Sequence, residues 1–146
     1  MRAMERTHDR SAEIEFLNDG MRTVPLHAQM GLRVHELGAR TTLTMELSES
    51  MRGSFEGSIH GGMLATFADA ASAISLAGSF DPEIQLPVTT DMHIRYYRQP
   101  RGGPLTANVS VVHNGRRLLS CECVIEDAES RVLARSTATY MIAPRQ

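Results

Sequence analysis

The stretch from Gly53 to Gly78 decides the fold of this chain: G-S-F-E-G-S-I-H-G-G-M-L-A-T-F-A-D-A-A-S-A-I-S-L-A-G. It opens with small residues and one histidine, His60, and continues after two glycines as an almost uninterrupted apolar run. Apart from Glu56, Asp69 is its only charged residue. An unpaired carboxylate in a buried apolar element costs several kcal/mol of desolvation, so it is normally neutralised, paired or used for chemistry.

The run from Gly61 to Gly78 predicts a helix that the rest of the protein wraps. A membrane-spanning helix is disfavoured, because Asp69 at the midpoint would add about 2.5–3.5 kcal/mol to its insertion. The apolar residues form two neighbouring stripes, so the helix is apolar over most of its circumference. These stripes are Met63, Phe67 and Ile74, and Leu64, Ala68 and Ala71.

The segment before residue 32 predicts a short helix followed by a second short turn or helix. Residues 11–21 are amphipathic, with Ser11 able to cap the start and Gly20 the end. Pro25 begins a second short turn or helix that Gly31 closes.

Alternating apolar and polar residues predict strands on both sides of the central helix. Two strands in residues 32–47 form a hairpin, and four follow the helix, in residues 88–98, 105–111, 118–126 and 131–142. The Asn114-Gly115 pair is the strongest short hairpin signal in the chain. We therefore expect an α+β fold, in which an antiparallel sheet of about five to six strands curls around one buried helix.

The composition predicts one domain, residues 1–146, with a helical segment at 1–30 packed on it. A chain of 146 residues that is 42% hydrophobic can bury a sizeable core. Its net charge of -2 argues against a dedicated surface for nucleic acid or anionic membranes. The N-terminus lacks the apolar core of a signal peptide, so we expect a cytoplasmic protein.

The two cysteines predict buried, reduced core residues. Cys121 and Cys123 lie two apart on a predicted strand and are poorly placed to form a disulfide. No histidine lies nearby at ligand spacing, so we expect no metal site.

The start of the central helix is suited to binding a carbonyl oxygen. The first N–H groups of a helix have no partner within it, and the helix dipole adds positive charge there. Glycines at Gly61 and Gly62 let a substrate approach the backbone, although they also permit tight packing. Asp69 lies eight residues further on, about 12 Å along the axis, and cannot reach a carbonyl bound at Gly61 of its own helix. If both serve one reaction, two copies of the chain must share the site about a two-fold axis.

These residues carry a resemblance to a known family. His60-Gly61-Gly62 followed by Asp69, with Y-Y-R-Q-P and N-G-R downstream, is similar to the signature of hot-dog fold thioesterases of the phenylacetate-pathway type. The resemblance implies a homodimer, often paired into a tetramer, that hydrolyses acyl-coenzyme A thioesters without a cofactor other than the coenzyme A of its substrate. It implies that the Gly61 N–H polarises the thioester carbonyl, that His60 sets the loop and lies near the thioester, and that Asp69 of the partner subunit is nucleophile or general base.

Two positions bear on how far the resemblance carries. Family members commonly have Asn or Gln six residues before the histidine, where this chain has Ser54. Thr89 matches a Ser or Thr that some relatives place at the start of the strand after the helix. Strict alternation puts Thr89 on the face opposite Met92, so it reaches the site only at a strand end or beside a bulge.

Each candidate residue also has a structural interpretation. Asp69 could pair with an arginine in a dimer interface, and His60 could simply cap a helix. Arg116 and Arg117 could hold the phosphates of coenzyme A or be merely solvated. The other histidines are expected to be surface or packing residues: His27, His35, His93 and His113.

Hydrolysis of an acyl-CoA thioester is the leading functional prediction. A non-catalytic protein that binds acyl-CoA or a fatty acyl group, including a regulator of that kind, is the alternative on the same fold. A hydratase or dehydratase is a third, but no Asp and His stand about five residues apart at the helix start.

Overall fold

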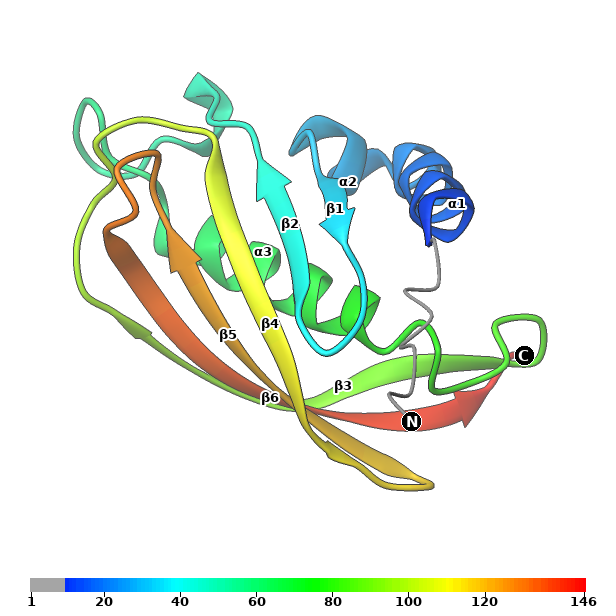
Figure 1. The fold of residues 1–146 in the computed structure, drawn as a ribbon. Helices are drawn as coiled ribbons and strands as arrows, with labels where there is room; N and C mark the ends of the chain where they lie inside the picture. The colour runs from blue at the N-terminus through cyan, green and yellow to red at the C-terminus, as the bar shows by residue number, and fades with distance from the viewer. Residues whose placement is uncertain (1–9) are drawn as a thin grey trace, which may run out of the picture.

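The computed structural model describes residues 10–146. Three helices, a short 3-10 turn and six strands follow one another in the predicted order (Figure 1). The helical elements are α1 (Ser11–Thr23), α2 (Pro25–Gln29), η1 (Glu49–Met51) and α3 (Gly61–Ser75). The strands are β1 (Arg33–Glu36), β2 (Thr41–Met45), β3 (Gln85–Tyr96), β4 (Leu105–Asn114), β5 (Leu118–Glu126) and β6 (Val132–Pro144).

The strands form one antiparallel sheet in the order β1-β2-β4-β5-β6-β3. The sheet curves around α3, which lies across its concave face (Figure 1). The β4–β5 hairpin turns at Asn114-Gly115, as the sequence predicts. The predicted α+β architecture, a long helix wrapped by a curved antiparallel sheet, is confirmed.

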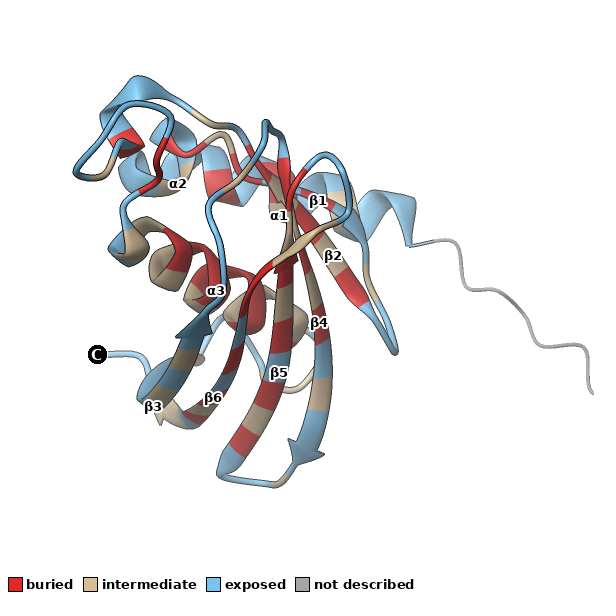
Figure 2. Cartoon of the chain, turned by 90° about the vertical axis from the view of Figure 1, so that its left-hand side faces the viewer, coloured by how far each residue is buried: buried red, intermediate tan, exposed pale blue. Residues whose placement is uncertain are grey.

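The core lies between α3 and the concave face of the sheet. Buried and more exposed residues alternate along β4 and β5, which confirms the period of two in the sequence (Figure 2). Phe67 of α3 is fully buried, and burying a side chain of this kind stabilises the fold by about 1.5–3 kcal/mol. Met63 and Ile74 are only half-buried, so one side of α3 is incompletely covered by its own chain. The buried residues around Phe67 include Leu64, Ala68 and Ala71 of the helix and Leu105, Ala107, Val109 and Ile125 of the sheet.

The first helix differs from its prediction at both ends. Arg10 holds the capping position, and Ser11 is the first helical residue. Gly20 lies inside the helix, which continues to Thr23. The helix ends there because Pro25 favours an extended preceding residue, and Val24 has φ -89° and ψ 113°. The second helix agrees with its prediction, since Pro25 is its first residue and Gly31 follows it with φ +59°. Residues 1–9 of the predicted helical segment lie outside the described residues.

The central helix begins at Gly61 as predicted and ends at Ser75, before the predicted Gly78. After the helix the chain makes two hydrogen bonds between residues three apart, the spacing of a 3-10 turn. The Leu76 N–H donates to the Ala73 carbonyl, and the Ala77 N–H donates to the Ile74 carbonyl. None of the helices within residues 10–146 combines the length and apolar character needed to cross a membrane.

The two edges of the sheet differ. Asn18 of α1 covers the β1 edge: its Nδ2 donates to the Val34 carbonyl at 3.1 Å, and its Oδ1 accepts from the Val34 N–H at 2.7 Å. At the other edge, β3 pairs only with β6 among the described residues and has 12 residues. A long, uncovered edge strand favours pairing with another strand.

Both cysteines are buried and free, as predicted. Burial raises the pKa of the Cys121 thiol and raises the pKa of Cys123 to about 12. Neither thiol is therefore a reactive thiolate near neutral pH.

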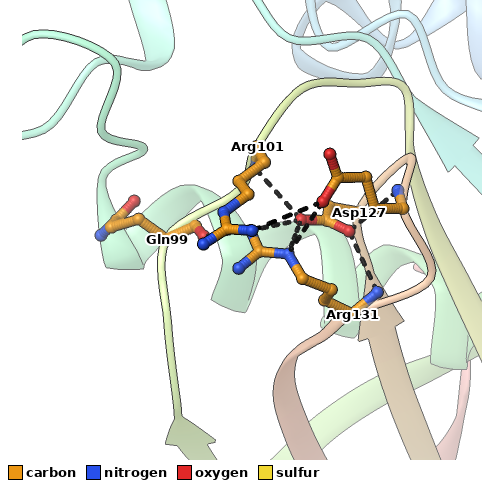
Figure 3. A network of polar contacts seen from close by, with 5 residues as sticks. Gln99, Arg101, Asp127 and Arg131 are labelled. Carbon is orange, nitrogen blue, oxygen red and sulfur yellow. Dashed lines mark hydrogen bonds and ion pairs between the residues drawn. The ribbon is translucent and has the colours of Figure 1, made fainter.

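The turn between β5 and β6 is built around the buried carboxylate of Asp127 (Figure 3). Its oxygens accept backbone N–H bonds from Arg101, Glu129 and Arg131, each at 3.0 Å. The Arg131 guanidinium adds Nε and Nη2 contacts to Oδ2 at 3.0 and 2.7 Å. Burial by itself raises the pKa of Asp127, but these donors outweigh it and hold the pKa at about 2, below the ordinary 3.8.

Replacing Asp127 by asparagine is expected to lower the urea midpoint of unfolding at neutral pH. A carboxyl group whose pKa is lower in the folded state contributes its stability above the unfolded value of 3.8 and loses it as the pH falls toward about 2. The gap in midpoint between wild type and Asp127→Asn should therefore shrink across that window. Glu129→Gln in the same turn is the control and should follow wild type, because Glu129 is 55% exposed. A gap that stays constant through this range would contradict the prediction.

Candidate active site

Asp69 is half-buried on α3 and is held by two hydroxyl groups. Its Oδ1 accepts hydrogen bonds from Thr89 Oγ1 on β3 and from Tyr140 Oη on β6, each at 2.8 Å. The Tyr140 hydroxyl also lies 2.9 Å from the main-chain oxygen of Asp69, so its single hydrogen is shared between two acceptors. No group within residues 10–146 forms a hydrogen bond with Oδ2. One carboxylate oxygen is thus anchored, and the other is left for a group from outside the chain.

Tyr140 is a site residue that the sequence analysis missed. Burial raises the pKa of its hydroxyl, and the hydrogen bond and negative charge of Asp69 raise it further. Tyr140 therefore stays protonated and donates toward Asp69 at neutral pH. The sequence feature that could have revealed Tyr140 is its inward-facing position in the alternation of β6. A buried tyrosine normally needs a hydrogen-bond partner for its hydroxyl.

Thr89 reaches Asp69 because β3 carries a bulge. Thr89 pairs with Tyr140 and Asp91 pairs with Thr139, so Thr90 is an extra residue without an opposite partner. An extra residue reverses the alternation on one side of the bulge. Thr89 therefore faces α3 on the same side as Met92, and the condition set by the sequence, a bulge beside Thr89, is met.

The start of α3 is capped by His60. The imidazole Nδ1 accepts from the Gly62 N–H at 2.9 Å, which is the capping interpretation of this histidine. A Cβ added at Gly62 would lie 2.9 Å from Nδ1, so this position needs glycine for the cap to form. The Gly61 N–H has no acceptor within residues 10–146. The helix start thus presents one free backbone donor.

Two further residues contact this helix start, and both belong to the Y-Y-R-Q-P stretch of the sequence signature, for which no role was predicted. Tyr96 donates its hydroxyl to the Gly61 carbonyl at 3.0 Å. The Gln99 amide pairs with the backbone of Ile59, accepting from its N–H at 2.8 Å and donating to its carbonyl at 3.4 Å. Tyr96 ends β3 and Gln99 lies in the segment after it, and the signature that contains them does not say which backbone groups they contact.

A family model described as the thioesterase superfamily matches residues 56–134, more than half of the chain. The chain belongs to the thioesterase superfamily. The matched region contains α3 with His60, Gly61 and Asp69, as well as the bulge in β3. The prediction of a thioester hydrolase with the hot-dog fold is confirmed at the level of this superfamily.

Two proteins named as acyl-CoA thioesterases are similar to more than half of this chain. The medium/long-chain acyl-CoA thioesterase YigI of Salmonella typhimurium is 26% identical over 133 residues, which are 82% of this chain and 86% of that protein. YigI of Escherichia coli K12 is 27% identical over 96 residues, 58% of this chain and 62% of that protein.

Solved structures share the fold. A crystal structure of a thioesterase superfamily protein superposes with a TM-score of 0.82 at 29% identity, covering 91% of this chain and all of the other. A thioesterase from Haemophilus influenzae has a TM-score of 0.80 at 20% identity, with 90% of each chain covered. A Streptococcus mutans protein bound to acetyl CoA has a TM-score of 0.67 at 19% identity, with 79% and 90% covered.

Other predicted residues lie apart from Asp69 in this member of the superfamily. Ser54 is exposed in the loop that leads to α3, and Arg116 and Arg117 are exposed in the β4–β5 hairpin. That hairpin lies far from the loop in both views of the chain (Figures 1 and 2). Within the described residues, no hydrogen bond joins any of these three side chains to Asp69.

The histidines other than His60 are surface or packing residues, as predicted. His93 and His113 are exposed, and His35 bonds to Thr44 Oγ1 at 2.7 Å on the surface. His27 is half-buried, and its Nδ1 is buried without a hydrogen-bond partner. Burial lowers the pKa of His27, while the negative charge of Asp69 acts in the opposite direction.

Proposed function

We propose that this protein hydrolyses acyl-CoA thioesters to a free acid and coenzyme A. The observation that carries the proposal is the Asp69 carboxylate, which two hydroxyls anchor through Oδ1 while Oδ2 has no hydrogen-bond partner among residues 10–146. Membership of the thioesterase superfamily supports it. So do the relative named as a medium/long-chain acyl-CoA thioesterase and the structural neighbour bound to acetyl CoA. The finer resemblance, to the phenylacetate-pathway type, is part of the proposal.

Asp69 Oδ2 starts the reaction as general base or as nucleophile. As a base it takes a proton from water while the water oxygen bonds to the thioester carbon. As a nucleophile it bonds to that carbon itself, and water later hydrolyses the anhydride. In both routes the carbonyl oxygen becomes an oxyanion, the carbon–sulfur bond breaks, and coenzyme A leaves as a thiol after protonation. The reaction needs no cofactor beyond the coenzyme A carried by the substrate.

The Gly61 N–H stabilises the oxyanion in this proposal. It is a free donor at a helix start, where the dipole adds positive charge. His60 shapes this end by capping α3, and Gly62 keeps the space for that cap. The imidazole is exposed beside the same N–H and thus lies close to the thioester.

Two subunits complete each site. Gly61 and Asp69 lie eight residues apart on one helix, about 12 Å along its axis. The open β3 edge and the half-buried side of α3 are the surfaces that a second copy would cover. We propose a homodimer with antiparallel α3 helices, and a dimer of dimers as the larger assembly.

Ser54, Thr89, Arg116 and Arg117 complete the proposed substrate contacts. The two exposed arginines are free to bind the phosphates of coenzyme A. Ser54 stands where phenylacetate-type members carry Asn or Gln, and its shorter side chain favours a second candidate function: binding acyl-CoA without turnover. The buried free thiols are suited to a reducing compartment, and a cytoplasmic location belongs to the same proposal.

A thiol-release assay across short, medium, long and aryl acyl-CoA substrates tests the proposed function. The purified protein should release thiol from at least one class. Saturable binding with no release from any class would favour the binding protein instead, and neither binding nor release would rule out both.

Mixed dimers test the shared site. An Asp69→Asn chain lacks the carboxylate, and a Gly61→Pro chain lacks the helix-start N–H. If each site takes one group from each subunit, co-expressed chains assemble heterodimers with one intact site, and the mixture regains about a quarter of wild-type activity. If both groups acted within one chain, no dimer in the mixture would hold an intact site. A monomer that turns over substrate would also contradict the proposal.

A further inference from the structure

The backbone around the His60–Gly61 peptide is almost completely engaged. The Ile59 N–H and carbonyl both bond to the Gln99 amide. The His60 N–H donates to the Met51 carbonyl at 2.8 Å, and the His60 carbonyl accepts from the Met63 N–H at 2.9 Å.

The next residue completes the pattern. The Gly61 carbonyl accepts from the Tyr96 hydroxyl. Of the six backbone N–H and C=O groups of residues 59–61, only the Gly61 N–H therefore lacks a partner in the described chain. The peptide that carries this donor is held on one side by Gln99, which follows β3, and on the other by Tyr96, the last residue of β3.

The clamping segment is itself fixed to the sheet. The Gln99 carbonyl accepts from Arg131 Nη2 at 3.1 Å, and Arg131 is held by the buried Asp127 (Figure 3). The Tyr97 N–H donates to the Leu133 carbonyl at 2.8 Å. The positions of Tyr96 and Gln99 thus depend on a buried ion pair and on the β6 ladder.

We infer that Gln99 and Tyr96 are positioning residues that hold the Gly61 N–H in the direction required by the developing oxyanion. An oxyanion donor is effective when its direction is fixed before the reaction, since no reorganisation is then needed in the transition state. Neither side chain needs to touch the substrate for this role. The inference rests on the proposed function. It adds that two residues outside α3, Gln99 and Tyr96, fix the direction of the Gly61 N–H.

Three variants of the full chain test the inference. Gln99→Ala removes both bonds to Ile59, and kcat should fall by about ten- to a hundredfold. Tyr96→Phe removes one bond to Gly61 and should cost about fivefold in kcat. In both, KM should change little, and the pH profile of kcat/KM should keep its wild-type shape because Asp69 is untouched. Tyr97→Phe is the matched control, because Tyr97 lines a hollow with His93 and Arg135 rather than the helix start, and it should keep wild-type kcat.

Amide hydrogen exchange gives a readout that does not depend on turnover. The backbone around residues 59–62 should exchange faster in Gln99→Ala than in Tyr97→Phe. If Gln99→Ala does not fold, Tyr96→Phe decides the question by the same measurements. The inference would be overturned if the wild type is active and both Gln99→Ala and Tyr96→Phe keep full kcat, whether or not their KM is raised. The proposed function would then stand. A wild type that releases no thiol would instead overturn the proposed function.

Discussion

Asp69→Asn is expected to lower kcat for thioester hydrolysis by about 10²–10⁴-fold while leaving the fold unchanged. Asparagine has the shape of aspartate, and its amide oxygen can take the place of Oδ1 and accept from Thr89 and Tyr140. The amide nitrogen then stands where Oδ2 was. It can neither take a proton from water nor attack a carbonyl carbon, so both routes are blocked.

Initial rates of thiol release, together with the thermal unfolding midpoint, measure this effect. The midpoint should stay close to wild type, because both hydroxyl contacts are kept. Asp91→Asn is the matched control. It removes an exposed carboxylate on β3, just beyond the bulge that brings Thr89 to Asp69, and should retain wild-type kcat. Full activity in a folded Asp69→Asn protein would rule out the carboxylate mechanism.

Local patterns were sufficient for the architecture. The apolar run of α3 and the alternation in the strands predict a wrapped helix because burial depends on which side of an element is apolar. The failure at Gly20 has a local cause: glycine often ends a helix, but here Pro25 sets the end.

The contacts within the site could not be predicted from local sequence patterns. Alternation alone places Thr89 away from Asp69, since an extra residue in β3 is visible only against its partner strand. Tyr140 lies 71 residues from Asp69, and Gln99 lies 40 residues from Ile59. Contacts of that kind follow from strand register and loop closure, which composition and periodicity do not specify.

Gly61→Pro is expected to lower kcat by about 10²–10³-fold, because it removes the Gly61 N–H, which has no acceptor among residues 10–146. Proline is tolerated at the first position of a helix, where its missing N–H costs no internal bond. His60 already has φ -64° and ψ 130°, the extended conformation that a residue before proline prefers. The helix should therefore form, and its first donor should be absent.

Gly61→Ala separates the lost donor from the added bulk. An alanine Cβ would lie 3.5 Å from Tyr96 Cζ, an ordinary contact, and the N–H would remain. We expect this variant to retain most of the wild-type kcat, with a helix content by circular dichroism equal to that of Gly61→Pro. If alanine and proline reduced kcat equally, steric exclusion of the substrate would explain the loss. If the folded proline variant kept full kcat, the Gly61 N–H would not be the oxyanion donor. A large loss with proline alone is the result expected of an oxyanion donor at Gly61, because both variants add a Cβ and only proline removes the N–H.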